Sequence, residues 1–374
     1  MGYLIGRGIA DITGEAAEVG MLGYGMKHQQ TEGIHLRLRA RAFVFVDGDR
    51  RILLVVCDLP LMFDGVRRAV LARLEGPFGD RYHERNTMLT VTHTHCGTGG
   101  YAHDWLYNTT TGGFRPKTFG SLVDGIVEAV ELADADVAPA RLLLARGELR
   151  NASVNRAQTA FERNPRSDRA FFPDGVDPQT TVLTIERDGT AVGAINWFAT
   201  HNTSMTNRNR LISSDNKGYA AYAWERLERG GGYRTGDSAG SLGFISAFAQ
   251  TNAGDMSPNL ELRPGCGPTH DEFENTRIIG TRQYGAAAKL VAGAEREVTG
   301  GLDFASTYVD LGDSLCARSS RVTGRCTGRA GRRLVRRHSP ASGPTVRPSQ
   351  ASARAATRCS TCSRATCCTG CLAG

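Results

Sequence analysis

Two histidines, His93 and His95, close a run of β-forming residues and lead into a glycine-rich turn in the stretch MLTVTHTHCGTGG at 88–100. Because side chains at positions i and i+2 of a strand share a face, the sequence predicts that both imidazoles point the same way. Two adjacent imidazoles beside a loop of small residues could form half of a metal site or of an acid–base site. A pair of hydrogen-bonded histidines near a turn is the alternative interpretation.

A third histidine, His201, follows another predicted strand, and Ser257 lies in the loop NAGDMSPN at 252–259. Ligands of α/β sheets gather beyond the carboxyl ends of strands, so these segments are expected to converge. Neutral imidazoles are good zinc ligands, which makes His93 and His201 candidate ligands of a catalytic Zn²⁺. Ser257 is followed by proline, so its loop is not a G-x-S-x-G nucleophile elbow, and its composition also fits an ordinary turn.

The elements that must position these residues begin with an alternating stretch at 34–46, which predicts one strand with Ile34, Leu36 and Leu38 on one face. A turn at 47–49 leads to a second strand at 51–57, whose continuous apolar run predicts burial on both faces. A helix at 66–75 and the strand before His93 complete a strand–helix–strand crossover unit.

Further helices and strands follow in the second part of the chain. Thr118 is predicted to cap a helix that extends to about Ala133. Further strands are predicted at 141–149, 180–186, 191–200 and 244–249, and further helices at 224–229 and 272–297. The predicted fold is α/β, with a mixed β-sheet catalytic domain and flanking helices at 1–313 and a disordered tail at 314–374.

The basic residues and the cysteines are distributed unevenly. Of the 45 Lys and Arg residues, 12 are arginines at 314–374, where no acidic residue occurs, so the body carries 33 basic against 38 acidic residues. The net charge of +7 therefore comes entirely from the tail. The tail has too few large apolar residues to offset its conformational entropy, which predicts disorder. Its cysteines resemble a zinc knuckle and its arginines an RNA-binding arm, but it has no aromatic residue to stack on a base, and no nucleic-acid partner is expected.

Several motifs resemble the neutral (neutral/alkaline, non-lysosomal) ceramidase family. They comprise, in order along the chain, GRGIADITG at 6–14, GIHLRLRARAFVF at 33–45, THTHCGTGG at 92–100, NASVNRA at 151–157, WFATHNTSM at 197–205 and NAGDMSPN at 252–259. The resemblance covers about residues 3–313, the N-terminal catalytic part of the family. It implies a zinc-dependent amidase that cleaves the N-acyl amide of ceramide into sphingosine and a fatty acid.

The resemblance also implies roles for individual residues. His93 and His201 correspond to zinc ligands, and His95 to a neighbour of the metal that acts on the scissile amide. Ser257 corresponds to the nucleophile, and Arg156 to an arginine that positions the substrate or the serine. The implied partner is a ceramide or related sphingolipid substrate, drawn from a membrane surface. No segment is long and apolar enough to predict a transmembrane helix.

The sequence also departs from the family pattern. The family completes its zinc shell with a downstream glutamate and tyrosine and ends in an immunoglobulin-like domain, and the sequence is expected to lack these segments. The text after about Ser314 looks like a GC-rich gene read in a shifted frame, which suggests a frameshifted or truncated ceramidase. A non-catalytic remnant is therefore one alternative function.

A metal-free serine hydrolase that uses Ser257, His95 and either Asp255 or Asp58 is another alternative. The start of the chain lacks the pattern of a signal peptide, which predicts a cytoplasmic protein and leaves secretion open. Three scattered cysteines in the body fit a reducing compartment.

Overall fold

The computed structural model describes residues 2–230, 243–293 and 296–308. The described helices are α1 (Asp64–Phe78), η1 (Gly79–Arg81), α2 (Trp105–Asn108), α3 (Pro116–Ala135), α4 (Gln158–Phe161), α5 (Arg166–Arg169), α6 (Asp215–Tyr222), η2 (Ala223–Glu228) and α7 (Glu272–Val291). The strands are β1 (Tyr3–Asp11), β2 (Ala17–Leu22), β3 (Gln30–Ile34), β4 (Arg39–Asp47), β5 (Arg50–Cys57), β6 (Thr87–Val91), β7 (Gly97–Thr98), β8 (Ala138–Glu148), β9 (Val154–Asn155), β10 (Gln179–Arg187), β11 (Thr190–Phe198), β12 (Leu211–Ile212), β13 (Ile245–Gln250), β14 (Met256–Ser257) and β15 (Arg296–Glu297).

A mixed nine-stranded sheet organises the fold. Its strand order is β13-β11-β10-β8-β1-β4-β5-β6, with β15 paired to β8. The β11–β13 and β5–β6 pairs are parallel, and the other pairs of this sheet are antiparallel. Two small sheets, β12-β3-β2-β7 and β14-β9, complete the strand pairing. The predicted α/β class with a mixed sheet is confirmed.

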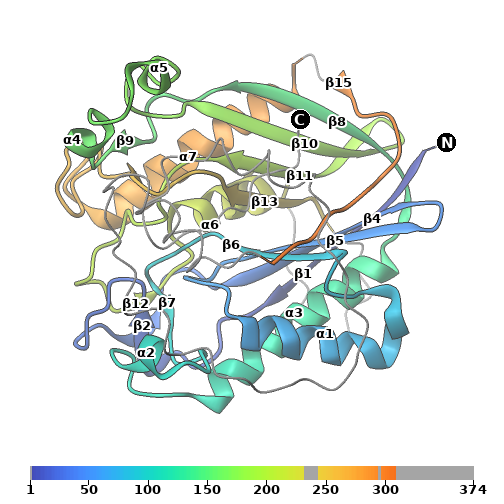
Figure 1. Cartoon of the computed structure of the whole chain (residues 1–374), viewed down its shortest axis with the longest axis horizontal. Helices are drawn as coiled ribbons and strands as arrows, with labels where there is room; N and C mark the ends of the chain where they lie inside the picture. Colours follow the sequence, from blue (N-terminus) through green and yellow to red (C-terminus); the bar gives the residue numbers. More distant parts are fainter. Residues whose placement is uncertain (1, 231–242, 294–295, 309–374) are drawn as a thin grey trace, which may run out of the picture. The chain divides into compact units, whose positions relative to one another are not determined.

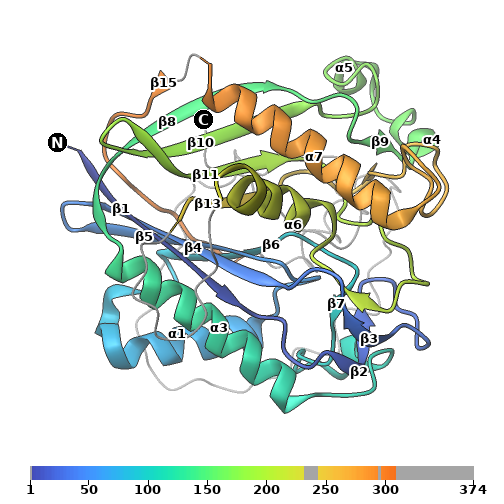
Figure 2. The same ribbon diagram turned by 180° about the vertical axis from the view of Figure 1, so that it is seen from behind.

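The large sheet curls so that its two halves face each other. One apolar cluster joins Phe43 and Phe45 of β4 to Ile195 of β11 and Ala247 of β13, and so fills the space between the halves. A second cluster packs α1 and α3 on the outer face of β4 and β5, and a third packs α6 and α7 on the other half. The result is a four-layer α/β/β/α arrangement, with α1 and α3 on one side and α6 and α7 on the other (Figures 1 and 2).

Glycines in β1 allow α3 to lie unusually close to the sheet. A Cβ at Gly6 would stand 1.9 Å from the carbonyl oxygen of Ala133, and one at Gly8 would stand 2.0 Å from that of Ala129. Because any larger residue at Gly6 or Gly8 would push α3 away, these two positions cannot carry the β-branched side chains that usually mark strands. The sequence pattern therefore did not predict β1.

Most predicted elements lie where the sequence placed them. The strand–helix–strand unit is β5-α1-β6, with a parallel β5–β6 pair, and the apolar run of β5 is buried from Leu53 to Cys57. The helix stripe of Val66, Val70 and Leu74 is buried in α1.

Three predicted boundaries are wrong. The stretch 34–46 is not one strand, because β3 ends at Ile34 in the small sheet and β4 begins at Arg39 in the large one. Between them the chain changes sheets, so Ile34 is 36% exposed while Leu38 is fully buried. Thr118 does not cap α3, because the helix begins two residues earlier at Pro116, and proline is a favoured first helical residue. The hydroxyl of Thr118 donates to Glu15 instead.

The helix predicted at 272–297 ends at Val291, and Arg296–Glu297 forms β15 against β8. The helix predicted at 224–229 is present as η2, a π-helix that continues α6. The sequence pattern did not predict α6 itself. The predicted tail 314–374, its disorder and the domain boundary at 313/314 lie outside the described residues. None of the described helices has the length and apolar character needed to cross a bilayer.

The described residues divide between two units, the first ending at Phe304 and the second beginning at Ala305. All described helices and strands belong to the first unit. Of the second, residues 305–308 are described, and they form neither helix nor strand.

Candidate active site

His93 and His95 lie in the loop after β6 rather than in the strand itself. The strand ends at Val91, and His93 has a φ of 64°, a left-handed conformation that is uncommon for a residue with a side chain. The prediction of a strand at the two histidines is therefore wrong, although the turn still brings their rings together. Nε2 of His95 lies 3.1 Å from Nε2 of His93.

The ring of His93 is oriented by a backbone carbonyl. Nδ1 of His93 lies 2.7 Å from the carbonyl oxygen of Pro60. A carbonyl can only accept, so Nδ1 carries the proton and Nε2 keeps its lone pair. The same geometry makes Nε2 of His95 the donor toward His93. Nδ1 of His95 is buried and has no hydrogen-bond partner in the described part of the chain.

His201 joins this pair from the loop after β11. Its Nδ1 lies 2.6 Å from the carbonyl oxygen of Ala253 and 3.1 Å from that of Met256. Nδ1 of His201 is therefore also the protonated atom, and its Nε2 lone pair is the atom left for a ligand or a donor. The backbone N–H of His201 donates to the same Met256 carbonyl, at 2.9 Å.

The three histidines form one cluster of candidate metal ligands. One nitrogen from each ring lies within 4.8 Å of the others, and the ring of His93 is 4.7 Å from that of His95 and 5.0 Å from that of His201, between centroids. The carbonyl bonds of His93 and His201 fix the tautomer that metal-binding histidines use. The donor set therefore fits a zinc ion held through Nε2 of these two residues.

Burial keeps the three imidazoles uncharged. It lowers the pKa of His93, lowers that of His95 to well below its usual value, and lowers that of His201 to about 3, with the nearby Arg156 guanidinium adding to each effect. Only the neutral imidazole has a lone pair to offer a metal. The cluster is therefore in its ligand form at neutral pH.

The small β9–β14 sheet brings Arg156 to the cluster and holds Ser257 next to Met256, whose carbonyl contacts His201. Ser257 pairs with Val154, and the backbone N–H of Arg156 donates to the carbonyl of Asp255 at 2.8 Å. The guanidinium of Arg156 donates to Nε2 of His201 at 3.2 Å and to the carbonyl of Gly254 at 3.2 Å. Ser257 is 5% exposed and its hydroxyl accepts the backbone N–H of Asn259. All five site residues predicted from the sequence thus belong to one neighbourhood.

Two groups of this neighbourhood were missed by the sequence analysis. Gln250, the last residue of β13, donates its side-chain amide to the carbonyls of Thr92 at 3.0 Å and Thr200 at 2.6 Å. It thereby ties together the two loops that carry the histidines. The sequence shows only a glutamine at the end of a predicted strand. This pattern does not distinguish a residue that joins two loops from an ordinary turn residue.

Gly23 and Tyr24 cover His95. The Tyr24 ring meets the His95 ring edge-on at 4.6 Å, and its hydroxyl donates to the carbonyl of Met205 at 2.6 Å. A Cβ at Gly23 would stand 2.6 Å from the His95 ring, so only glycine fits there. No periodicity or motif in the sequence indicates this contact.

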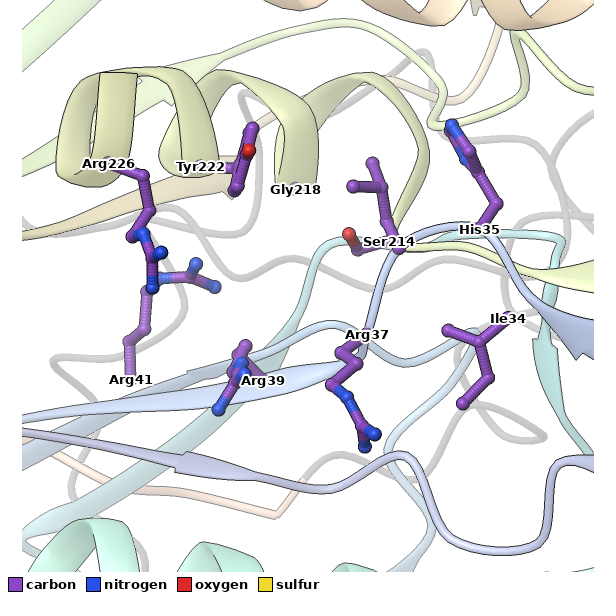
Figure 3. Close-up of a pocket in the computed structure, with 10 residues that line it drawn as sticks. Ile34, His35, Arg37, Arg39, Arg41, Ser214, Gly218, Tyr222 and Arg226 are labelled. Atoms are coloured by element: carbon purple, nitrogen blue, oxygen red, sulfur yellow. The ribbon is translucent and has the colours of Figure 1, made fainter. Parts of the chain in front are cut away.

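A pocket of about 440 Å³ lies elsewhere, between α6 and the start of β4, and its lining includes none of the predicted site residues. Arg37, Arg39 and Arg41, which alternate along the chain, line one side (Figure 3). Arg41 pairs with Asp58 and Glu225, and Arg37 pairs with Asp11. Arg39 also lies 3.8 Å from Asp11, so all three arginines are in ion pairs, and the histidine cluster remains the candidate active site.

Comparisons with known proteins identify the family of the chain. Residues 3–335 match the family described as "Neutral/alkaline non-lysosomal ceramidase, N-terminal". The chain is 56% identical over 317 residues to the neutral ceramidase of Mycobacterium tuberculosis and 49% identical over 311 residues to that of Pseudomonas aeruginosa. These matches cover 83% and 82% of this chain and 49% and 45% of the two relatives.

Solved structures give the same result. The crystal structure of neutral ceramidase from Pseudomonas aeruginosa has a TM-score of 0.74 at 50% identity, covering 81% of this chain and 47% of that one. A structure titled "Ceramidase complexed with C2" has a TM-score of 0.75 at 49% identity, covering 81% of this chain and 46% of that one. The chain thus spans about half the length of the relatives it matches. It belongs to the neutral/alkaline non-lysosomal ceramidase family, whose N-terminal region it carries.

Proposed function

We propose that this chain is a zinc-dependent amidase that hydrolyses the N-acyl amide of ceramide to sphingosine and a fatty acid. The observation that carries the proposal is the histidine cluster, in which backbone carbonyls hold Nδ1 of His93 and His201 and leave both Nε2 atoms for a metal. The relatives named neutral ceramidases support the choice of ceramide as substrate. The substrate is a membrane lipid, so the chain would act at a membrane surface.

His93 and His201 would hold the zinc. Bound zinc would supply a Lewis acid that polarises the amide carbonyl, which an amide needs because it resists attack. Ser257 would provide the nucleophilic hydroxyl, on a strand pair that holds it next to the His201 loop. His95 would exchange protons with the reacting groups, because its buried Nδ1 has no other partner in the described part of the chain.

Arg156 would have a positioning role. Its guanidinium donates to the His201 lone pair that the metal would use, so zinc binding must displace it from that nitrogen. It would then be free to orient the substrate or Ser257 while its backbone stays hydrogen-bonded to Asp255. Such an exchange would link metal loading to the position of the Arg156 guanidinium.

Zinc content and ceramide turnover of the purified chain test the proposal together. We expect about one zinc per chain at the histidine cluster, loss of activity on chelation, and restoration by added zinc. Ser257→Ala should lower kcat by at least about 1,000-fold and leave zinc binding unchanged. Turnover that survives both chelation and Ser257→Ala would contradict the proposal.

A chain that binds zinc weakly and does not turn over ceramide is the second candidate. The ligand set favours it, because the group assembled in the described part of the chain consists of three histidines. The glutamate and tyrosine that complete the zinc shell in the resemblance are not in that group. A folded protein with substoichiometric zinc and no turnover would identify this case.

The metal-free serine hydrolase has less support. His95 presents Nε2 to His93, and its Nδ1 has no partner in the described part of the chain, so the described residues form no Ser–His–Asp relay through His95. Asp58 is paired with Arg41, and Asp255 accepts from Asn155. Activity that is insensitive to chelators and lost in Ser257→Ala would favour this alternative.

A further inference from the structure

A second cluster of possible metal ligands lies in the loop that connects β14 to α7. Glu261, Cys266 and His270 each place one ligand atom within 4.8 Å of the other two. Cys266 is a free cysteine, and Nε2 of His270 lies 3.3 and 3.2 Å from the two carboxylate oxygens of Glu261. These residues belong neither to the histidine cluster nor to any motif singled out in the sequence.

A tight turn sets the spacing of Glu261 and Cys266. The backbone N–H of Glu261 donates to the carbonyl of Cys266 at 3.2 Å, and that of Cys266 donates to the carbonyl of Arg263 at 2.9 Å. Leu262 and Gly265 both adopt positive φ, 59° and 72°, which folds the chain back on itself. The carboxylate and the thiol therefore come from the two sides of one closed turn.

Asn275 of α7 fixes His270 relative to this turn. Asn275 is 1% exposed and donates its amide to the carbonyls of Gly265 and Thr269, both at 2.9 Å. Its side-chain oxygen accepts the backbone N–H of Thr269 at 2.8 Å. Gly265 precedes Cys266 and Thr269 precedes His270, so one buried side chain holds the backbone of both ligand-bearing segments.

We propose that Glu261, Cys266 and His270 form a second binding site for a divalent metal of the zinc class. Thiolate, imidazole and carboxylate are the donors that zinc takes, at about 2.0–2.3 Å, so tetrahedral donors lie about 3.3–3.8 Å apart. The separation between Nε2 of His270 and Oε1 of Glu261, 3.3 Å, already matches, and the Cys266 thiol lies within 4.8 Å of both ligand atoms. The fourth position faces solvent for a water ligand. The bound metal would connect the loop after Ser257, through Glu261 and Cys266, to His270 just before the start of α7.

Arg263 modulates this site. Its guanidinium contacts Oε2 of Glu261 and leaves Oε1 for the metal. Its positive charge lies close to the site and opposes the binding of a divalent ion. Arg263→Gln is therefore expected to tighten metal binding by about tenfold at low ionic strength.

Cobalt(II) provides a test, because a cobalt–thiolate bond gives a near-ultraviolet charge-transfer band that a site of histidines alone cannot give. The full chain is used with its seven cysteines at 316–371 replaced by serine, which leaves Cys266 and the buried Cys57 and Cys96. We expect titration with cobalt to produce the band, zinc to remove it by competition, and Cys266→Ser to abolish it.

The exposed His270 provides a second variant that does not threaten folding. His270→Ala should weaken the cobalt affinity at least about 10- to 100-fold while His201→Ala leaves the band unchanged. A band that persists in Cys266→Ser, or that never appears up to ~1 mM cobalt in a folded protein, overturns the proposal. Neither outcome depends on ceramide turnover or on zinc at the histidine cluster.

Discussion

The two candidate metal clusters are built in opposite ways. The histidine cluster gathers residues from loops more than 100 positions apart, and backbone carbonyls orient two of its three rings. The Glu261–Cys266–His270 cluster comes from ten consecutive residues, and a single side chain of α7 holds it. His95 and His201 are buried, whereas Glu261 and His270 are exposed.

This difference predicts how each cluster responds to change. The buried cluster depends on the whole sheet, so remote substitutions should disturb it, and a metal there is shielded from water. The exposed cluster depends only on its own turn and on Asn275. Its metal should exchange readily and follow the metal concentration of the surroundings.

The largest effect is expected from His201→Ala. Removing this ligand should weaken zinc binding at the histidine cluster by at least about 100-fold, since even second-shell changes cost 10- to 100-fold. Zinc competition with a fluorescent chelator measures the change. His270→Ala is the matched control and should leave this affinity unchanged. Equal losses in both variants would mean that the two clusters are not independent.

Gln250→Leu should damage the buried cluster without touching a ligand. It removes the amide that bonds the Thr92 and Thr200 carbonyls, and leaving two buried acceptors unpaired costs about 2–3 kcal/mol. Urea unfolding measures the loss, and zinc affinity should fall with it. Gln179→Leu, at an exposed position in β10, is the control and should change the free energy of unfolding little. If Gln250→Leu leaves the free energy of unfolding unchanged, the Gln250 amide does not stabilise the two histidine loops.

Gly23→Ala should act on His95 through a steric collision. Its Cβ would collide with the His95 ring, so we expect kcat/KM for ceramide to fall by about tenfold or more, a loss of about 1.4 kcal/mol. Gly25→Ala provides the control, because its φ is also positive and nothing lies within 4 Å of a Cβ there. Similar losses in both variants would point to backbone strain instead of the collision.

Lys217 makes the stability of the fold depend on pH. This fully buried side chain donates to the carbonyls of Phe198 and Ala249, at the ends of β11 and β13, and burial lowers its pKa from 10.5 to about 7. The folded pKa is below the unfolded one, so unfolding takes up a proton between these values. The free energy of unfolding should therefore fall by about 1.4 kcal/mol per pH unit as the pH drops from 10.5 to 7, and level off below 7.

Measurements of urea unfolding between pH 7 and 10 compare the native chain with two variants. Lys217→Met should lose this part of the slope, and Lys289→Met, at an exposed position in α7, should keep it. The Glu261 turn lies outside this effect, so its cobalt band should not report the Lys217 titration. A slope retained in Lys217→Met would assign the proton to another group.

The sequence predicted which residues meet at the buried cluster better than it predicted how they meet. Side-chain chemistry at strand ends marked His93, His201 and Ser257, and the apolar periodicity marked β5, α1 and β6. The backbone of His93, with its positive φ, could not be inferred, because the two-residue spacing fits a strand equally well. The prediction that the rings of His93 and His95 lie side by side was right, and the prediction that these residues form a strand was wrong.

Other features were hidden because they arise from long-range packing. The change of sheet between Ile34 and Arg39 leaves the alternation of side chains intact, so no local pattern reveals it. The start of α6 is rich in buried polar residues, Asp215, Asn216 and Lys217, which partner distant groups and obscure its helical pattern. Burial of polar residues is decided by those partners, which a single sequence does not show.

The curled sheet also sets an order of events during synthesis. The apolar side chains of Phe43 and Phe45 are covered by β13, which begins at Ile245. At 5–20 residues per second, the ribosome needs roughly 10–40 s to make the intervening chain. During that interval the first half of the sheet presents an uncovered apolar face. The nascent protein is therefore prone to aggregation until β13 emerges, and the histidine cluster, which needs the loops after β11 and β13, forms late.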